Sequence, residues 1–133
     1  QFGNFFLGEA NHMAKTVLIV DDSLSIRQLV RAALTSVGYG VIDAIDGQDA
    51  LNKLVGQRVN LIISDVNMPN MDGITFLKAL KSKPEHKFTP VVMLTTESQE
   101  AKKKEGQEAG ARAWIVKPFQ PPQLLAAVEK LIL

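Results

Sequence analysis

The stretch TVLIVDDSLSIRQLV, residues 16–30, runs from an apolar segment straight into two adjacent aspartates and then into a helical pattern. Its first part, TVLIV, is apolar on both alternating sides, which is typical of a strand covered on both faces of a sheet. Apolar residues then recur at helical spacing as far as Val37, and Gly38 marks the expected end of the helix. The stretch therefore predicts a buried strand that delivers two negative charges to its carboxyl end.

The same alternation of strand and helix continues along the chain. The apolar segments VIDAI, NLIIS, PVVMLT and ARAWIV come after the first one, and a helical pattern comes after each of them. With right-handed crossovers, such units wind into one α/β domain, a doubly wound five-stranded parallel sheet with helices on both faces. The segment VIDAI carries a charge in the middle of the strand, which favours a position at the edge of the sheet.

The helical patterns differ in what they offer the core. The second begins after Asp46, an expected cap. The fourth, SQEAKKKEGQEAG, has few apolar residues and contains Gly106, which predicts a solvated face and a weakly anchored helix that is able to move. The expected apolar faces consist of Ile26, Leu29, Val30, Ala33, Leu34 and Val37 in the first helix, Ala50, Leu51, Leu54 and Val55 in the second, Ile74, Phe76, Leu77 and Leu80 in the third, and Leu124, Leu125, Val128, Leu131 and Ile132 in the fifth.

Composition narrows the class of protein. The 133 residues fit one compact core, and 15 basic and 14 acidic residues give a net charge of +1. No basic run is interleaved with aromatic residues, which argues against direct binding of nucleic acid. The chain has no cysteine, which excludes disulfides, zinc thiolate sites and thiol catalysis and favours a cytoplasmic protein. His12 and His86 belong to no ligand pattern, and we expect them in exposed loops.

The first 13 residues, QFGNFFLGEANHM, differ in pattern from the rest of the chain. Their short apolar patch has neither the basic start nor the small-residue cleavage site of a signal peptide, and it is too short to span a membrane. We therefore expect residues 1–13 to form an added or disordered tail and residues 14–133 to form the domain. The alternative is a genuine partner-binding segment at the amino terminus.

Polar residues stand directly after four of the predicted strands. Asp21 and Asp22 come after the first, Asp65 after the third, Thr95 after the fourth and Lys117 after the fifth. Ligands of doubly wound sheets bind beyond the carboxyl ends of the strands, so we expect these side chains to meet at one edge. Taken singly, each is also an ordinary turn or cap residue, and Asp22 is a candidate cap for the first helix.

Clustered carboxylates raise one another's pKa unless a cation neutralises them. Oxygen ligands without histidine or cysteine favour Mg²⁺, which is often completed by phosphate oxygens. A carboxylate also acts as a nucleophile toward phosphorus when positive groups neutralise the transferring charge. Asp65 is the candidate nucleophile, with Lys117 and Thr95 beside it, and the aspartate pair is the candidate metal site.

The motifs VLIVDDS, SDVNMPNMDG, LTT and VKPF resemble the receiver domain of two-component response regulators, over nearly all of residues 15–133. The resemblance implies a CheY-like, flavodoxin-like fold. It implies that Asp65 accepts a phosphoryl group from a sensor histidine kinase. It also implies that Asp21 and Asp22 bind Mg²⁺, with coordination completed by Asp65 and the backbone carbonyl of Asn67.

The same resemblance implies further roles. Thr95 is then the hydroxyl that turns toward the phosphoryl group, and Lys117 pairs with that group and precedes a cis bond to Pro118. Trp114 takes the place of an aromatic switch residue that is usually Tyr or Phe; alternatively, its bulky indole only covers the sheet edge.

Two more positions tune autodephosphorylation in this family, and Asn67 and Glu97 occupy them. Together with the motif NMPNMDG, they resemble the chemotaxis CheY type, whose signals are short-lived. The alternative is that both side chains simply face solvent.

The resemblance implies no enzymatic turnover beyond the chain's own phosphorylation and dephosphorylation. Output is expected through protein contacts on the face formed by the fourth helix, the fifth strand and the fifth helix, either in a single-domain regulator or in a receiver cut from a larger transcriptional or hybrid-kinase regulator. A flavodoxin-like FMN-binding module shares the topology, although two aspartates in its first loop would repel a phosphate. A haloacid-dehalogenase-like phosphatase normally carries D-x-D after the first strand, where this chain has DDS.

Overall fold

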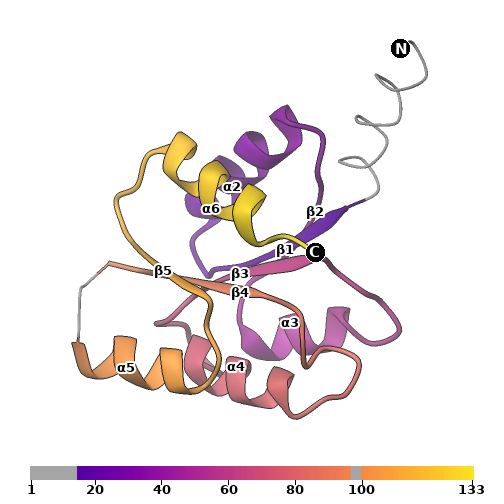
Figure 1. The fold of residues 1–133 in the computed structure, drawn as a ribbon, viewed down its shortest axis with the longest axis vertical. Helices are drawn as coiled ribbons and strands as arrows, with labels where there is room; N and C mark the ends of the chain where they lie inside the picture. The colour runs from indigo at the N-terminus through magenta and orange to yellow at the C-terminus, as the bar shows by residue number, and fades with distance from the viewer. Residues whose placement is uncertain (1–14, 97–99) are drawn as a thin grey trace.

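The computed structural model describes residues 15–96 and 100–133, and these form a parallel sheet of five strands in the order β2-β1-β3-β4-β5. Helices α2 and α6 cover one face of the sheet and α3, α4 and α5 cover the other (Figure 1). The predicted doubly wound α/β fold is therefore confirmed. The elements are β1 (Thr16–Val20), α2 (Leu24–Ser36), β2 (Gly40–Ala44), α3 (Gly47–Lys53), β3 (Leu61–Asp65), α4 (Gly73–Lys81), β4 (Val91–Thr95), α5 (Glu100–Glu108), β5 (Ala113–Val116) and α6 (Pro121–Leu131).

The sheet separates two apolar cores. Along β1, Leu18 packs into the core beneath α3, α4 and α5, while the next residue, Ile19, packs into the core beneath α2 and α6. β3 repeats this alternation with Ile62 and Ile63. Strands β1, β3 and β4 are buried on both sides, as expected for segments that are apolar at every position.

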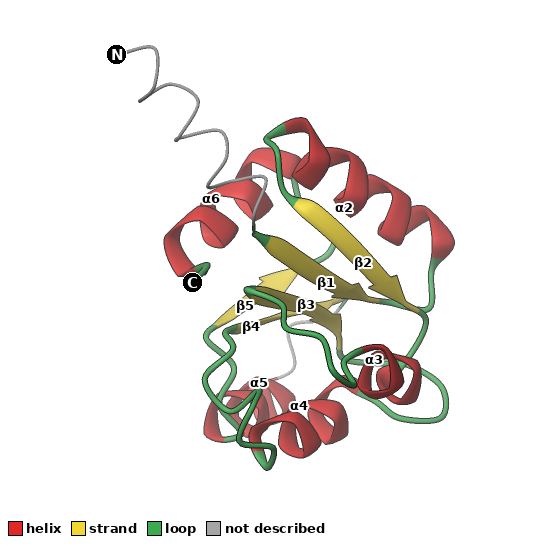
Figure 2. Cartoon of the chain, turned by 90° about the vertical axis from the view of Figure 1, so that its right-hand side faces the viewer, coloured by secondary structure: helices red, strands yellow, loops and turns green. Residues whose placement is uncertain are grey.

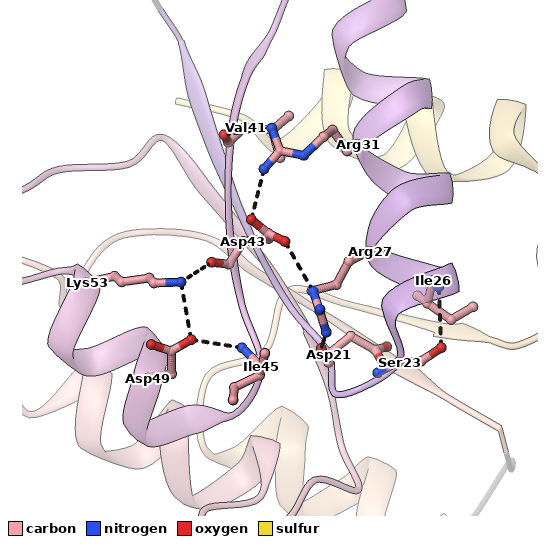
Figure 3. A network of polar contacts seen from close by, with 10 residues as sticks. All are labelled: Asp21, Ser23, Ile26, Arg27, Arg31, Val41, Asp43, Ile45, Asp49 and Lys53. Carbon is pink, nitrogen blue, oxygen red and sulfur yellow. Dashed lines mark hydrogen bonds and ion pairs between the residues drawn. The ribbon is translucent and has the colours of Figure 1, made fainter.

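Strand β2 lies at one edge of the sheet, next to β1 (Figure 2). This confirms the edge position expected from the charge of Asp43. The carboxylate of Asp43 pairs with Arg27 at 3.1 Å and with Arg31 at 2.9 Å, and both arginines belong to α2 (Figure 3). At this edge the Asp43 side chain keeps 36% of its surface exposed.

Side-chain caps begin the helices that come after the first two strands. The Ser23 side chain accepts a hydrogen bond from the backbone N–H of Ile26 and caps α2, so Asp22 does not serve as its cap. Asp46 caps α3 as expected, by accepting from the N–H of Asp49 at 2.8 Å. Asp22 is thus left for another role at the carboxyl edge of the sheet.

Several expectations about burial were wrong. Leu29 and Val37 are exposed because the buried stripe of α2 runs through Val30 and Leu34. Val55 is 81% exposed because α3 ends at Lys53 and leaves it beyond the helix.

His86, expected in an exposed loop, is buried at 4% exposure. Its backbone N–H donates to the carbonyl of Lys83, and its own carbonyl accepts from the backbone N–H of Thr89, so two successive tight turns meet at this residue. His12 lies outside the described residues. None of the helices in the described part of the chain has the length and apolar character needed to cross a membrane.

Candidate functional site

Three carboxylates meet at the carboxyl edge of the sheet. Asp21 and Asp22 come directly after β1, Asp65 is the last residue of β3, and one oxygen of each lies within 4.8 Å of the others. They meet because β1 and β3 are paired in parallel, which aligns their carboxyl ends. Asp21 is fully buried and Asp65 is 6% exposed, whereas Asp22 faces solvent. The cluster therefore has a buried part and an open part.

Each polar atom of Asp21 has a partner. Its backbone N–H donates to the carbonyl of Ala44 at 3.0 Å, and its own carbonyl accepts from Arg27 at 2.7 Å. One carboxylate oxygen accepts from the N–H of Ser23 at 2.8 Å, and the other from Lys117 at 2.8 Å. Asp21 is consequently held both at its backbone and at its side chain.

Lys117 brings the positive charge. Its ammonium lies 2.8 Å from Asp21 and 3.5 Å from Asp65. Its backbone N–H donates to the carbonyl of Thr95 at 2.6 Å, which ties the segment after β5 to the end of β4. The bond between Lys117 and Pro118 is cis, as the resemblance implied. One lysine therefore bridges two buried carboxylates.

The pKa of the Asp65 carboxyl is raised above its ordinary value. Burial is the main cause that raises the pKa of Asp65, and the charge of Asp21 adds to it. Lys117 and the N–H of Val66, which donates to Asp65 at 2.8 Å, act in the opposite direction but do not cancel the increase. Three carboxylates whose oxygens lie within 4.8 Å of one another are hard oxygen ligands and fit a divalent cation such as Mg²⁺.

A cavity of about 630 Å³ opens beside the three carboxylates. Thr96 lines this cavity, whereas the preceding Thr95, the predicted switch residue, is buried at the end of β4. The lining consists of Asp21, Asp22, Ser23, Ser25, Ile26, Asp65, Thr96, Lys117 and Pro118. The volume is ample for a phosphoryl group approaching Asp65 from solvent.

Three predicted residues remain, namely Asn67, Glu97 and Trp114. Asn67 is exposed in the loop after β3, and Glu97 falls outside the described residues. Trp114 is partly buried under α5, against Gly106, where an added Cβ would come within 2.9 Å of its ring. Its indole nitrogen is buried and has no hydrogen-bond partner among the described residues. The indole therefore packs against α5 at Gly106.

Gly73 is a site residue that sequence reasoning missed. It begins α4, and a Cβ there would overlap the backbone carbonyl oxygen of Asp65 and lie 2.9 Å from the terminal methyl of Met93. Its N–H donates to the carbonyl of Val66 at 2.8 Å. A glycine directly after the cap Asp72 was the available signal, because glycine is a poor choice for the first turn of a helix unless space demands it.

Comparisons with known proteins agree with this geometry. Residues 17–129 match the family model described as response regulator receiver domain. The structure is similar to that of the chemotaxis protein CheY4 of Vibrio cholerae, with 50% identity, a TM-score of 0.84, and coverage of 88% of this chain and 98% of that one.

Two curated relatives differ in length. Protein PilG of Pseudomonas aeruginosa is 37% identical over 85% of this chain and 84% of its own. The regulatory protein ResD of Bacillus subtilis is also 37% identical, but only 47% of its length is covered. The chain thus spans about half the length of several curated relatives that it matches. The match over residues 17–129, together with the CheY-like fold, shows that this chain belongs to the response regulator receiver domain family of two-component systems.

Proposed function

We propose that this receiver domain accepts a phosphoryl group on Asp65 from a sensor histidine kinase and signals through a changed protein-binding surface. The observation that carries the proposal is the position of Asp65. Its carboxylate is buried at the end of β3, within 4.8 Å of two further carboxylates and 3.5 Å from the ammonium of Lys117, beside an open cavity. The proposed nucleophile Asp65, the positive charge of Lys117 and a cavity open to solvent thus lie together.

The proposed transfer is a displacement at phosphorus. A carboxylate oxygen of Asp65 forms the new P–O bond while the P–N bond to the donor histidine breaks, and the electron pair goes to the imidazole nitrogen. Lys117 neutralises the charge on the phosphoryl oxygens. Asp21, Asp22, Asp65 and the backbone carbonyl of Asn67 would hold Mg²⁺. When bound, the metal supplies further positive charge to the transferring group.

The signal ends by hydrolysis at the same site. Water attacks phosphorus, the P–O bond to Asp65 breaks, and the carboxylate is regenerated with release of inorganic phosphate. Asn67 and Glu97 would tune the rate by occupying or leaving the path of the water. The chain's chemistry would be limited to its own phosphorylation and dephosphorylation.

The output surface would be the face formed by α5, β5 and α6. In α5, between residues 101 and 108, Gly106 is the only residue that is buried, so little apolar packing opposes a shift of this helix. Thr95 would turn toward the phosphoryl group and Trp114 would change its position between β5 and α5. Phosphorylation shifts such an equilibrium only through its different interaction with the two states.

Similarity to the chemotaxis protein CheY4 supports a role in chemotaxis, with a histidine kinase upstream and a protein target downstream. The proposed location is the cytoplasm. The domain would comprise residues 14–133, and residues 1–13 would not be needed for the switch. The second candidate is a receiver that belongs to a longer transcriptional regulator, because ResD and similar relatives are about twice as long as the matched region. A flavin-binding module gains no support, since the family matched is that of receivers.

The test is mass spectrometry of the intact chain after exposure to acetyl phosphate, with and without Mg²⁺. The wild type is expected to gain one phosphoryl group only when Mg²⁺ is present, and Asp65→Asn is expected to gain none. Asp49→Asn, which changes a carboxylate outside the cluster, serves as the matched control and should still be phosphorylated. A wild type that stays unmodified, or an Asp65→Asn variant that is still modified, would overturn the proposal.

A further inference from the structure

Arg27 connects the acidic loop to the edge of the sheet. It lies one turn into α2, where its backbone N–H donates to the carbonyl of Ser23 at 3.1 Å. One end of its guanidinium donates to the backbone carbonyl of Asp21 at 2.7 Å, and its Nε pairs with Asp43 on β2 at 3.1 Å (Figure 3). The Arg27 side chain is 12% exposed and that of Asp43 is 36% exposed, whereas Asp21 is fully buried, so the contact with Asp21 is the better shielded of the two. The planar guanidinium is suited to such a bridge because its donors point in fixed directions.

Asp43 is itself held firmly at the other end of this bridge. Its second carboxylate oxygen accepts from Arg31 at 2.9 Å, and its backbone carbonyl accepts from Lys53 of α3 at 2.7 Å. Burial alone would raise the pKa of Asp43, but hydrogen bonds and charges from Arg31 and Arg27 outweigh burial and lower it. The carboxylate is therefore ionised at neutral pH, and it neutralises much of the positive charge of Arg27.

The carbonyl that Arg27 holds belongs to the residue at the centre of the acidic cluster. Asp21 is fully buried, so loss of Arg27 would leave a buried carbonyl without its partner. The loop would relax to hydrate that carbonyl, and the carboxylates of Asp21 and Asp22 would move with it. In metal sites, loss of a group that orients a ligand typically weakens binding by about ten- to a hundredfold.

We infer that Arg27 is a positioning residue for the metal site, which holds the Asp21–Asp22 loop in the geometry that binds Mg²⁺. The inference rests on the proposed function, since it takes the acidic cluster to be a Mg²⁺ site. If Arg27 acts only through its charge, or instead by positioning the loop, its removal is expected to change the affinity for Mg²⁺ in opposite directions. Deleting a nearby positive charge strengthens cation binding, whereas loosening the loop weakens it.

The experiment is a calorimetric titration of the metal-free full chain with Mg²⁺ at fixed ionic strength. Arg27→Ala is expected to bind Mg²⁺ about tenfold more weakly than the wild type. Arg31→Ala is the matched control, because Arg31 has the same chemistry, the same helix and the same partner Asp43, but no contact with Asp21. It should keep the wild-type affinity. As a second readout, the rise in unfolding midpoint at saturating Mg²⁺ should shrink in Arg27→Ala alone.

Arg27→Lys covers the case in which the alanine variant does not fold. Its single ammonium reaches either Asp21 or Asp43 but lacks the fork that joins them, so its affinity should lie between those of the wild type and Arg27→Ala. Wild-type affinity in either variant, tighter binding in Arg27→Ala, or an equal loss in Arg31→Ala would overturn the positioning role. A wild type that binds no Mg²⁺ would overturn the proposed metal site itself, and the role of Arg27 with it.

Discussion

The ammonium of Lys117 lies 2.8 Å from Asp21 and 3.5 Å from Asp65, so one cation serves two carboxylates from neighbouring strands. The side chains of all three residues are nearly buried, with exposures of 11%, 1% and 9%. At such sites, removing one partner leaves charge that water cannot screen well. This arrangement makes Lys117 a structural residue in the metal-free protein as well as the proposed partner of the phosphoryl group.

Lys117→Ala is expected to lower the free energy of unfolding of the metal-free protein by about 3 kcal/mol, because two buried carboxylates lose their counter-charge. The exposed pair of Lys78 and Glu105, 3.0 Å apart, provides the comparison. Lys78→Ala should cost less than about 1 kcal/mol. Urea unfolding in the presence of a chelator measures both, and equal losses would contradict the prediction.

Asp65→Asn is expected to stabilise the metal-free protein at neutral pH, because it removes a charge that burial disfavours. The pKa of Asp65 is raised in the folded state, chiefly by burial and then by Asp21, so the folded protein binds this proton more tightly than the unfolded chain. Binding of this proton by Asp65 therefore contributes most to the free energy of unfolding below the ordinary aspartate pKa. The contribution is lost as pH rises through the raised pKa of Asp65.

Urea unfolding of wild type and Asp65→Asn over a pH series measures this effect. The advantage of the asparagine variant should grow from acid toward neutral pH. Saturating Mg²⁺ should remove or reverse it, because the variant lacks one of the proposed ligands. A difference that is constant across the series would show that the ionisation of Asp65 is not its cause.

Gly73→Ala is expected to destabilise the protein by about 3 kcal/mol, since the new Cβ overlaps the carbonyl oxygen of Asp65. The better helix propensity of alanine recovers only about 1 kcal/mol. Thr75→Ala, in the same turn of α4 and exposed, is the control and should have a small effect. Thermal unfolding compares the two variants, and a stable Gly73→Ala protein would mean that α4 is free to withdraw from β3.

Gly106→Ala is expected to displace the indole of Trp114, because the added Cβ would lie 2.9 Å from the ring. Trp114 is the single tryptophan of the chain, so its fluorescence reports this directly. The emission should move to longer wavelength as the ring meets water. Gln107→Ala, at an exposed position of the same helix, should leave the spectrum unchanged, and an unshifted spectrum in Gly106→Ala would contradict a tightly filled space beside the ring.

The main features of fold and site were predictable from local patterns. Strands β1, β3 and β4 are apolar at nearly every position, and only a sheet covered on both faces buries such segments. Once the strands are parallel, the residues after them lie on one edge, which is why Asp21, Asp22 and Asp65 were expected together and lie together. The charge in the middle of β2 was enough to place that strand at an edge.

Other features depended on which segments come into contact. Helical periodicity shows that α2 has an apolar stripe, but only the placement of the sheet and of α6 decides that Val30 is covered and Leu29 is not. The burial of His86 depends on how the turn before β4 closes, which its neighbours in sequence did not reveal.

The sequence by itself therefore predicted which residues stand at the ends of the strands, because strand alternation and helical spacing are local properties. Only the tertiary structure decided three contacts. The carbonyl of Asp65 lies against Gly73, and the ring of Trp114 lies against Gly106. Arg27 contacts both Asp21 and Asp43. Each of these contacts joins residues from different elements. Its strength depends on distances of a few ångströms, which are set by the packing of helices on the sheet.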